Sequence, residues 1–458
     1  MKTKALKNLL IIGILSTIIT AFSGGMASKV LAATETSGTS TTINLSDTAI
    51  TVNGESISED LSEAVYKTTN VEVNNDVTTT VENTVVNITK GGTYTITGNA
   101  TNTQVAINVD DDEEVNLILN NVDLTCKTAP AIIIYNALDE EKAGTAGVTI
   151  TLADNSTNTI TGSHIPKNST YTVNGESKSY SAKYDAAISS EVSLIIDGNG
   201  TLIVDSDNEG LETKMHLTIN GGNIQINSED DAINASEDNV SVITINDGTV
   251  YANVKSDAKE GDGIDSNGYI YINGGNVYAF AAVTSQDSGL DSDLGIYING
   301  GTVIGTGNMV DEISEDSSQK FIFLQFNNQI SAVTLLTITD SNDSPITAYK
   351  TSKTYKTFLY SSSDLNTDSY NVYSGGTIEG KENNGLYSEI TSYQKGTEVS
   401  YSEANKSAGM MQGMGQMPSD MPNDIDNNSS SIIIGIGLVV VGAIILGSAI
   451  VVMKKNDK

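Results

Sequence analysis

The chain has 458 residues and a formal net charge of −33, and it contains no tryptophan. All of its 24 basic residues are lysines. So negative a protein repels nucleic acid and anionic lipid, which excludes both as direct partners and leaves divalent cations or neutral molecules as ligands. The single cysteine, Cys126, excludes an intrachain disulfide, so the fold must rely on a large core, on metal ions or on regular stacking.

The first 33 residues predict a secretory signal peptide. Lys2, Lys4 and Lys7 precede an apolar run over 9–22, and the small residues at 30–33 provide a cleavage point. Residues 34–87, which are acidic and rich in serine, are expected to form an N-terminal β cap.

A repeat follows the cap and is clearest between 186 and 305. The pattern of two aliphatic residues, asparagine and glycine occurs at 217–222, 243–248, 270–275 and 296–301, so its last glycine recurs every 26 or 27 residues. A unit of this length cannot bury its own apolar face, but stacked units can. Parallel strands joined by crossovers are nearly always right-handed. We therefore predict an all-β fold in which residues 88–309 form a right-handed parallel β-helix.

The turn of each unit has a backbone requirement. Glycine and asparagine tolerate the positive φ of a sharp corner. The aligned side chains of Asn220, Asn246, Asn273 and Asn299 are also expected to stack as an amide ladder, which is a structural role.

The pattern changes after 309. Residues 310–398 alternate over longer strands and predict a β-rich C-terminal subdomain, and 399–431 read as a flexible linker. Residues 432–453 are apolar throughout and would span about 33 Å as a helix, enough for a transmembrane segment. Lysines follow at 454–458, which places this short tail in the cytoplasm and the large domain outside the cell.

Carboxylates flank a small–aliphatic–polar motif that precedes each turn, and they are expected to align on successive coils. Carboxylates about 4.8 Å apart repel by roughly 1 kcal/mol per pair even in water, so such a ladder must be solvated, protonated or occupied by cations. Calcium takes six to eight oxygen ligands in flexible geometry. The candidate calcium ligands are Glu209, Glu212, Asp230, Asp231, Asp262, Asp265, Asp287 and Asp291. A simple solvated acidic edge is the alternative.

Two pairs of tyrosines occupy equivalent positions in neighbouring units. They are Tyr271 with Tyr297, and Tyr251 with Tyr278. Their flat faces and polar tips suit stacking on sugar rings, which makes them candidate carbohydrate-binding residues. Cross-strand aromatic pairs also stabilise sheets without a ligand, so both roles stay open.

Catalytic patterns are sparse. The chain lacks the arginine that a common pectate lyase uses as its base, and Lys214 beside Glu209 and Glu212 is the one conceivable substitute. Acidic neighbours would raise its pKa, whereas a base needs a lowered one. His164 and His216 belong to no catalytic motif. Paired carboxylates leave an inverting glycosidase open, but we expect no enzyme activity.

The segments K-G-G-T-Y-T-I-T-G at 90–98, V-D-D-D-E-E-V at 109–115 and L-I-L-N-N-V-D-L at 117–124 resemble the opening of β-helical carbohydrate-binding domain proteins of clostridia-like bacteria. The coils at 262–265 and 272–275 are similar to the repeated core of that family. The resemblance covers about 44–398. It implies a parallel β-helix shaped like pectate lyases, bound calcium, and binding of cellulose or pectin-type polysaccharide without established enzyme activity.

The sequence therefore predicts a membrane-anchored, extracellular carbohydrate-binding protein that holds plant-type or acidic polysaccharide with the help of calcium. Two alternatives stay open. One is a calcium-dependent pectate lyase, and the other is a structural or adhesive surface protein whose partner is a protein or the cell envelope.

Overall fold

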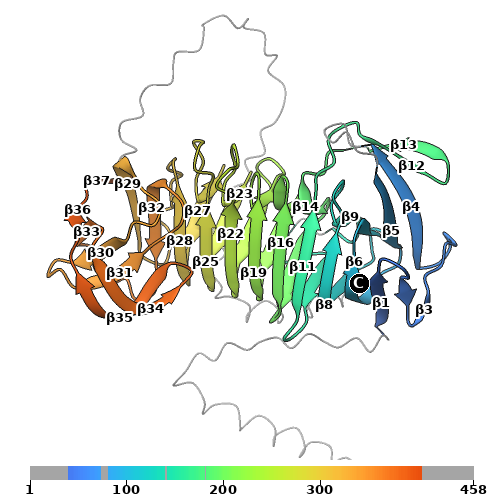
Figure 1. Ribbon diagram of the computed structural model, residues 1–458, viewed down its shortest axis with the longest axis horizontal. Helices are drawn as coiled ribbons and strands as arrows, with labels where there is room; N and C mark the ends of the chain where they lie inside the picture. The colour runs from blue at the N-terminus through green and yellow to red at the C-terminus, as the bar shows by residue number, and fades with distance from the viewer. Residues whose placement is uncertain (1–39, 74–80, 140–141, 181, 405–458) are drawn as a thin grey trace, which may run out of the picture. The chain divides into compact units, whose positions relative to one another are not determined.

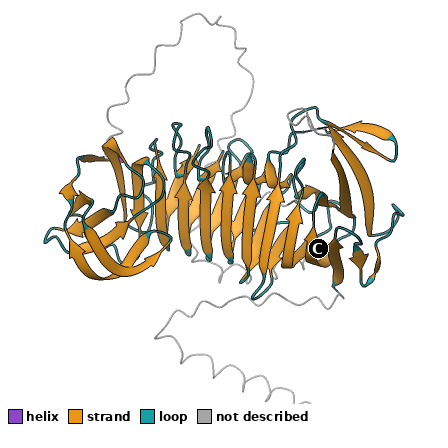
Figure 2. Ribbon diagram, in the orientation of Figure 1, coloured by secondary structure: helices purple, strands orange, loops and turns teal. Residues whose placement is uncertain are grey.

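A computed structural model describes residues 40–73, 81–139, 142–180 and 182–404 (Figure 1). They all belong to the compact unit Met1–Gly409. Every regular element among them is a β-strand, which confirms the all-β prediction (Figure 2). The predicted signal peptide, transmembrane segment and cytoplasmic tail, and most of the predicted linker, lie outside the described residues. Within the described ranges, no helix has the length and apolar character needed to cross a membrane.

Three columns of parallel strands form the centre of this unit. The first column contains β10 (Val148–Leu152), β15 (Leu194–Gly198), β18 (His216–Ile219), β21 (Val242–Ile245), β24 (Tyr269–Ile272) and β27 (Gly295–Ile298). The second contains β11 (Thr157–Gly162), β16 (Thr201–Ser206), β19 (Asn223–Ser228), β22 (Thr249–Val254), β25 (Asn276–Phe280) and β28 (Thr302–Gly307). The third contains β5 (Val81–Ile88), β7 (Thr103–Asn108), β9 (Ile132–Asn136), β14 (Ala186–Ser190), β17 (Glu209–Thr213), β20 (Ile233–Ala235), β23 (Ile264–Ser266) and β26 (Leu290–Ser292).

Each repeat of the sequence thus supplies one strand to each column, and the register keeps equivalent residues side by side. Ile219, Ile245, Ile272 and Ile298 are paired in succession, and none of them is exposed to solvent. Ladders of this kind belong to one continuous cluster of buried hydrophobic residues. Full burial of one such side chain is worth about 1.5–3 kcal/mol, so the stack is stabilised chiefly by its interior.

The N-terminal region caps the columns at one end. It comprises β1 (Thr41–Ser46), β2 (Thr51–Val52), β3 (Glu55–Ser56), β4 (Val65–Val73), β6 (Gly92–Ala100) and β8 (Val115–Thr125), together with the hairpin of β12 (Thr170–Val173) and β13 (Glu176–Ser179). Strand β1 is parallel to β6, and β6 is parallel to β8. Parallel pairing therefore begins inside the segment 34–87.

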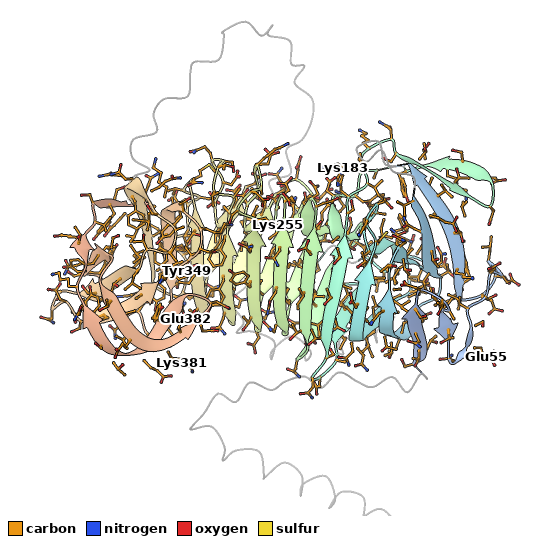
Figure 3. The ribbon with its side chains drawn as sticks, viewed as in Figure 1. Glu55, Lys183, Lys255, Tyr349, Lys381 and Glu382 are labelled. Atoms are coloured by element: carbon orange, nitrogen blue, oxygen red, sulfur yellow. The ribbon has the colours of Figure 1, made fainter. Side chains whose placement is uncertain are left out.

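The C-terminal region ends the parallel arrangement, because β28 pairs antiparallel with β32. One part contains β29 (Phe321–Ile330), β32 (Tyr355–Ser361) and β37 (Tyr401–Glu403). The other is a six-stranded antiparallel sheet of β30 (Leu336–Asp340), β31 (Pro345–Tyr349), β33 (Tyr370–Ser374), β34 (Thr377–Asn383), β35 (Leu386–Gln394) and β36 (Thr397–Glu398). A second buried cluster joins this region to the coils and includes Tyr278, Phe280 and Tyr349, the last labelled in Figure 3.

Lys353 stabilises the junction between the C-terminal region and the coils. It is only 4% exposed, and its Nζ donates to the carbonyl oxygen of Val254, to that of Phe280 (3.3 Å) and to Asn253 Oδ1 (3.3 Å). Burial lowers the pKa of Lys353 to about 7. Three oxygens around one amine satisfy its three possible donors, so this lysine has a structural role.

The predicted amide ladder is confirmed. Nδ2 of Asn246 donates to Oδ1 of Asn220 (2.9 Å), Asn273 donates to Asn246 (3.0 Å) and Asn299 donates to Asn273 (3.0 Å). Positive φ falls on the following glycines, for example +90° at Gly222, and not on the asparagines. The glycine therefore makes the corner, and the asparagine links one coil to the next.

Replacing an internal member of the ladder should cost more than replacing its end. Asn246→Ala removes two side-chain hydrogen bonds and should lower the free energy of unfolding by about 1–2 kcal/mol, at roughly 0.5–1 kcal/mol per exposed bond. Asn220→Ala removes one and serves as the matched control, with about half the loss. Urea unfolding of the full-length protein measures both, and equal losses would contradict a ladder role.

Candidate functional site

Carboxylates line the third column on both sides of its inward aliphatic residues. In one row, Glu212 lies opposite Asn234, which lies opposite Asp265, which lies opposite Asp291. The other row follows from backbone hydrogen bonds between coils: Gly210 N donates to the carbonyl of Asp231 (3.0 Å), and Ala232 N to that of Asp262 (3.0 Å). We call Glu209, Glu212, Asp231, Asp262, Asp265 and Asp291 the acidic edge.

Backbone amides hold two of these carboxylates in place. Oδ1 of Asp231 accepts from the amide of Asp262 (2.7 Å), and Oδ1 of Asp262 accepts from the amide of Ser288. One oxygen of each carboxylate therefore accepts a hydrogen bond from a backbone amide of the next coil. Among the described residues, neither side chain forms an ion pair with a lysine.

Two predicted ligands lie next to the rows. Ser288, not Asp287, takes the place beside Asp262, because Gly263 N donates to the carbonyl of Ser288 (3.1 Å). Asp287 instead accepts from the amide of Gly261 (2.8 Å). Asp230 directly precedes the row position of Asp231, and burial raises its pKa.

Two side chains at the start of the edge contain buried oxygens without a hydrogen-bond partner. Oε1 of Glu209 accepts from Nδ2 of Asn234 (3.1 Å), but Oε2 of Glu209 and Oδ1 of Asn234 have none. Glu209 is 6% exposed and Asn234 8%. Since an unsatisfied buried polar atom costs about 1–3 kcal/mol, these oxygens indicate a missing donor or cation.

Glu212 is satisfied by contrast. It is 1% exposed, and it accepts from Ser236 Oγ (3.0 Å), from Ser189 Oγ (3.3 Å) and from Lys214 Nζ. Lys214 Nζ also donates to Ser236 Oγ (3.2 Å), so the one conceivable catalytic base donates to both Glu212 and Ser236. This arrangement is unlike that of a lysine that must accept a proton.

Burial raises the pKa of most carboxylates on this edge, and their neighbours raise it further. The pKa of Asp262 rises to about 9, first because of burial and then because of Asp231. That of Asp265 rises to about 7 through burial and Asp291. The pKa values of Glu209 and Asp231 are well above the ordinary range for the same reason. At neutral pH the edge must therefore keep protons or take up cations.

The sequence did not predict one member of this group, Asp311. Its Oδ2 accepts from the amide of Ser292 (2.8 Å), and burial together with Asp291 raises its pKa to about 7. Asp311 follows the last coil, outside the repeat, so no spacing relates it to Asp291. Asp185, whose carbonyl accepts from the amide of Glu209 (3.0 Å) at the other end, was likewise not predicted as a ligand, and its side chain forms an ion pair with Lys183, which Figure 3 labels.

The carboxylates lie along the edge and do not converge. Among the described residues, no three or more His, Cys, Asp or Glu side chains are gathered so that they would hold a metal ion. Calcium at this edge would therefore require movement of side chains, with oxygens of neighbouring coils as ligands.

The first predicted tyrosine pair lies on the outer surface of the coils. The rings of Tyr271 and Tyr297 are stacked, with centroids 5.0 Å apart and an angle of 18° between the planes. Tyr269 lies 5.9 Å from the first ring and 6.2 Å from the second. Tyr297 also lines a depression of about 510 Å³ with Asp293 and Asp311, which places the tyrosines beside the end of the acidic edge.

The structure corrects the prediction that the second pair, Tyr251 with Tyr278, binds carbohydrate. Tyr278 is 1% exposed, and Tyr251 packs against the same buried cluster beneath the C-terminal region. Asn383 of β34 donates to the hydroxyl of Tyr278 (3.4 Å). Tyr278 is a core residue and Tyr251 is half-buried beside it, because the antiparallel sheet covers the outer face of β22 and β25.

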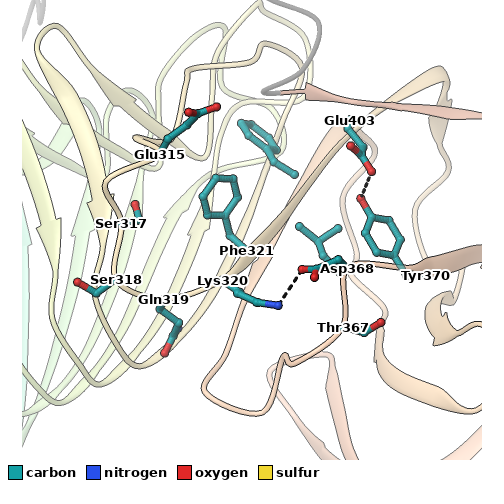
Figure 4. Close-up of a pocket in the computed structure, with 12 residues that line it drawn as sticks. Glu315, Ser317, Ser318, Gln319, Lys320, Phe321, Thr367, Asp368, Tyr370 and Glu403 are labelled. Carbon is teal, nitrogen blue, oxygen red and sulfur yellow. Dashed lines mark hydrogen bonds and ion pairs between the residues drawn. The ribbon is translucent and has the colours of Figure 1, made fainter.

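Another pocket, shown in Figure 4, has a volume of about 360 Å³. Three of its charged groups have partners, since Lys320 contacts Asp368 (2.7 Å) and the hydroxyl of Tyr370 donates to Glu403 (3.0 Å). It contains none of the predicted ligands, so it is separate from the acidic edge.

Stacked parallel coils with an acidic edge and outward aromatic rings define a β-protein built to present a binding surface. Residues 82–379 match the model of the family described as "Carbohydrate-binding domain-containing protein", and the chain belongs to this family. The family is the one that the motifs at 90–124 predicted.

A relative from Acetivibrio thermocellus, also described as a carbohydrate-binding domain-containing protein, is 30% identical over 179 residues. The match covers 39% of this chain and 57% of the relative. A solved structure, the gadolinium derivative of a polysaccharide lyase-like protein from C. thermocellum, is 20% identical, with a TM-score of 0.34, over 57% of this chain and 92% of that chain.

Proposed function

We propose that this protein binds plant-type or acidic polysaccharide, such as pectate or cellulose, with the help of calcium ions held on the acidic edge. The unpartnered, buried Oε2 of Glu209 carries the proposal, because it is a carboxylate oxygen that no donor satisfies. Asn234 Oδ1 next to it is the same kind of hard oxygen ligand.

Calcium ions on the acidic edge would have two effects. It would neutralise carboxylates such as Asp262 and Asp265, whose burial otherwise keeps them protonated near neutral pH. A calcium ion bound from one side also retains free coordination positions, which a uronate carboxylate can fill. A strongly negative protein without arginine can hold a negative sugar in this way.

The stacked tyrosines extend the same surface. Tyr297 lies in the depression that contains Asp311, so a sugar carboxylate near the edge would bring a neighbouring ring within reach of Tyr297 and Tyr271. Tyrosine faces suit the apolar faces of sugars, while the hydroxyls stay in water.

The architecture supports a display role. We propose that the three columns form a right-handed parallel β-helix, as in pectate lyases, and that the signal peptide and the segment 432–453 place it on the outer face of the cell membrane. Protease treatment of intact cells tests the location, because the ectodomain should be removed while a tag on the tail at 454–458 stays protected.

Retention on insoluble polygalacturonate tests the binding. The full-length protein should be retained in calcium and released by EDTA. Asp262→Asn combined with Asp265→Asn should weaken retention at least tenfold, since removing carboxylates from a calcium site lowers its affinity. Two exposed turn residues, changed together as Asp111→Asn and Asp112→Asn, are the control with the same charge change. Retention in EDTA would contradict the proposal.

The same assay separates the alternatives. Release of unsaturated uronate, seen by its ultraviolet absorbance, would establish a lyase. Failure to bind any glycan, with retention on cell-envelope material, would favour the adhesive function.

A further inference from the structure

Three tyrosines form a cluster on the outer surface of the last two coils. Tyr269 and Tyr271 are two residues apart on β24 and therefore point to the same side of the strand, and Tyr297 of β27 lies opposite Tyr271. All three residues are partly exposed. Tyr297 also borders the depression of about 510 Å³ described above, so solvent and small oxidants reach this group, which we call the tyrosine cluster.

Gly295 allows the ring of Tyr297 to lie close to the other two rings. Gly295 is opposite Tyr269, and a Cβ atom at Gly295 would lie 3.4 Å from Cε2 of Tyr297 and 3.8 Å from its hydroxyl. The ring of Tyr297 thus lies over the space beside the glycine, stacked on Tyr271 with centroids 5.0 Å apart and planes at 18°. Cε2 is one of the two ring carbons next to the hydroxyl-bearing carbon, and tyrosyl radicals couple at these positions.

The composition makes tyrosine the main side chain that one-electron oxidation can reach. The chain has no tryptophan, and its single cysteine, Cys126, is fully buried. Neither an indole nor an exposed thiol can therefore reduce a tyrosyl radical, which persists until it meets a partner. A partner that is already stacked on it reacts much faster than a free one, because groups held together have a very high effective concentration.

We propose that Tyr271 and Tyr297 are an oxidative cross-linking site, at which a one-electron oxidant joins the last two coils through a dityrosine bond. A peroxidase acting with hydrogen peroxide is an oxidant of this class. Each phenol loses one electron and one proton, which gives two tyrosyl radicals. The radicals form a carbon–carbon bond between their Cε atoms, and the two ring protons move to the oxygens and restore both phenols. The two electrons and two protons reduce one hydrogen peroxide to two water molecules.

The bond would connect β24 covalently to β27, in a chain whose single cysteine excludes an intrachain disulfide. It goes beyond the proposed function and does not depend on it, because neither calcium nor a polysaccharide takes part. The test is therefore done in EDTA without polysaccharide, so that a failure of polysaccharide binding leaves its result unchanged.

Two other tyrosine pairs provide comparisons within the same chain. Tyr251 and Tyr278 also lie opposite each other in neighbouring coils, but their rings are tilted by 39° with centroids 6.2 Å apart, and Tyr278 is only 1% exposed. Tyr171 and Tyr180 are closer, at 4.7 Å, but they are tilted by 38° and Tyr180 is 9% exposed. Parallel stacking and exposure are thus combined at the tyrosine cluster and at neither of these pairs.

Oxidation of the full-length protein with a peroxidase and hydrogen peroxide tests the proposal. Cleavage before aspartate separates 265–286, which contains Tyr269, Tyr271 and Tyr278, from 293–310, whose single tyrosine is Tyr297. Mass spectrometry of the monomeric protein should find these two peptides joined, at the sum of their masses minus two hydrogen atoms. Fragmentation of the joined peptides should place the bond on Tyr271.

Phenylalanine variants keep the rings, and hence the packing, but not the hydroxyls. Tyr297→Phe and Tyr271→Phe should each lower the dityrosine fluorescence of the monomer at least about fivefold, since proximity selects this pair. Tyr269→Phe and Tyr251→Phe are the matched controls and should retain most of the fluorescence. The proposal is overturned if the two peptides are not joined in the monomer. It is equally overturned if Tyr297→Phe forms as much dityrosine as the unmodified protein.

Discussion

In EDTA, the free energy of unfolding of the full-length protein is expected to fall by at least roughly 4 kcal/mol as the pH rises from 5 to 8. Asp262, with a pKa of about 9 in the folded state, keeps a proton that the unfolded chain releases near pH 4. Its contribution to stability is complete below pH 4 and is lost as the pH rises through 9, with a slope of about 1.4 kcal/mol per unit per proton. Asp265 and Asp311 act in the same direction up to about pH 7.

Calcium should restore the free energy of unfolding at pH values at which the carboxylates of the acidic edge ionise. At pH 8, calcium at a hundredfold excess over its dissociation constant should restore about 2.7 kcal/mol. At pH 5 the effect should be small, because protons compete for the same oxygens. Urea unfolding at constant ionic strength, with and without calcium, measures both.

Substitution identifies the group responsible. Asp262→Asn should be more stable than the unmodified protein in EDTA at pH 8, because it removes the buried carboxyl group that has to hold a proton at this pH, and it should respond less to calcium. Asp112→Asn changes the net charge equally at an exposed turn and should behave like the unmodified protein. A free energy of unfolding that stays constant between pH 5 and 8 in EDTA would show that the edge is solvated and carries no such proton.

Ile264→Ala should lower the free energy of unfolding by about 3–4 kcal/mol. Ile264 has no exposed surface and lies between Ile233 and Leu290 in the third column. Removing three carbons there leaves a cavity, and such substitutions in cores cost about 2–5 kcal/mol. Each coil contacts only its neighbours, so this one also couples the two halves of the stack.

The control is Val240→Ala. Val240 is 43% exposed, so its truncation should cost less than about 0.5 kcal/mol. Unfolding followed by circular dichroism gives both values. A loss below about 1 kcal/mol for Ile264→Ala would mean that the inner ladder is not the main source of stability.

Features that repeat were predictable from the sequence. Gly222, Gly248 and their equivalents recur because every coil needs a positive φ at the same corner. Asn220 and Asn246 recur because their amides must meet between coils. Requirements of this kind are local and identical in each unit, so they leave a period in the sequence.

The positions of single side chains were harder to predict from the sequence. The acidic character of the edge was evident, but the row continues at Ser288, one residue after Asp287, because the pairing of Ile264 with Leu290 places Ser288 opposite Asp262. Asp311 joins the edge from a segment after the repeat. A spacing argument does not find Asp311, since its place depends on how one particular loop returns to the stack.

The sequence by itself determined the all-β fold, the stacked units, the amide ladder and the family, all of which depend on local backbone needs or on motifs that recur along the chain. Only the tertiary structure decided which outward tyrosines stay accessible. Tyr271 and Tyr297 remain at the surface, whereas the C-terminal sheet buries Tyr278. Such contacts join segments distant in sequence, and nothing in the sequence around either partner records that they meet.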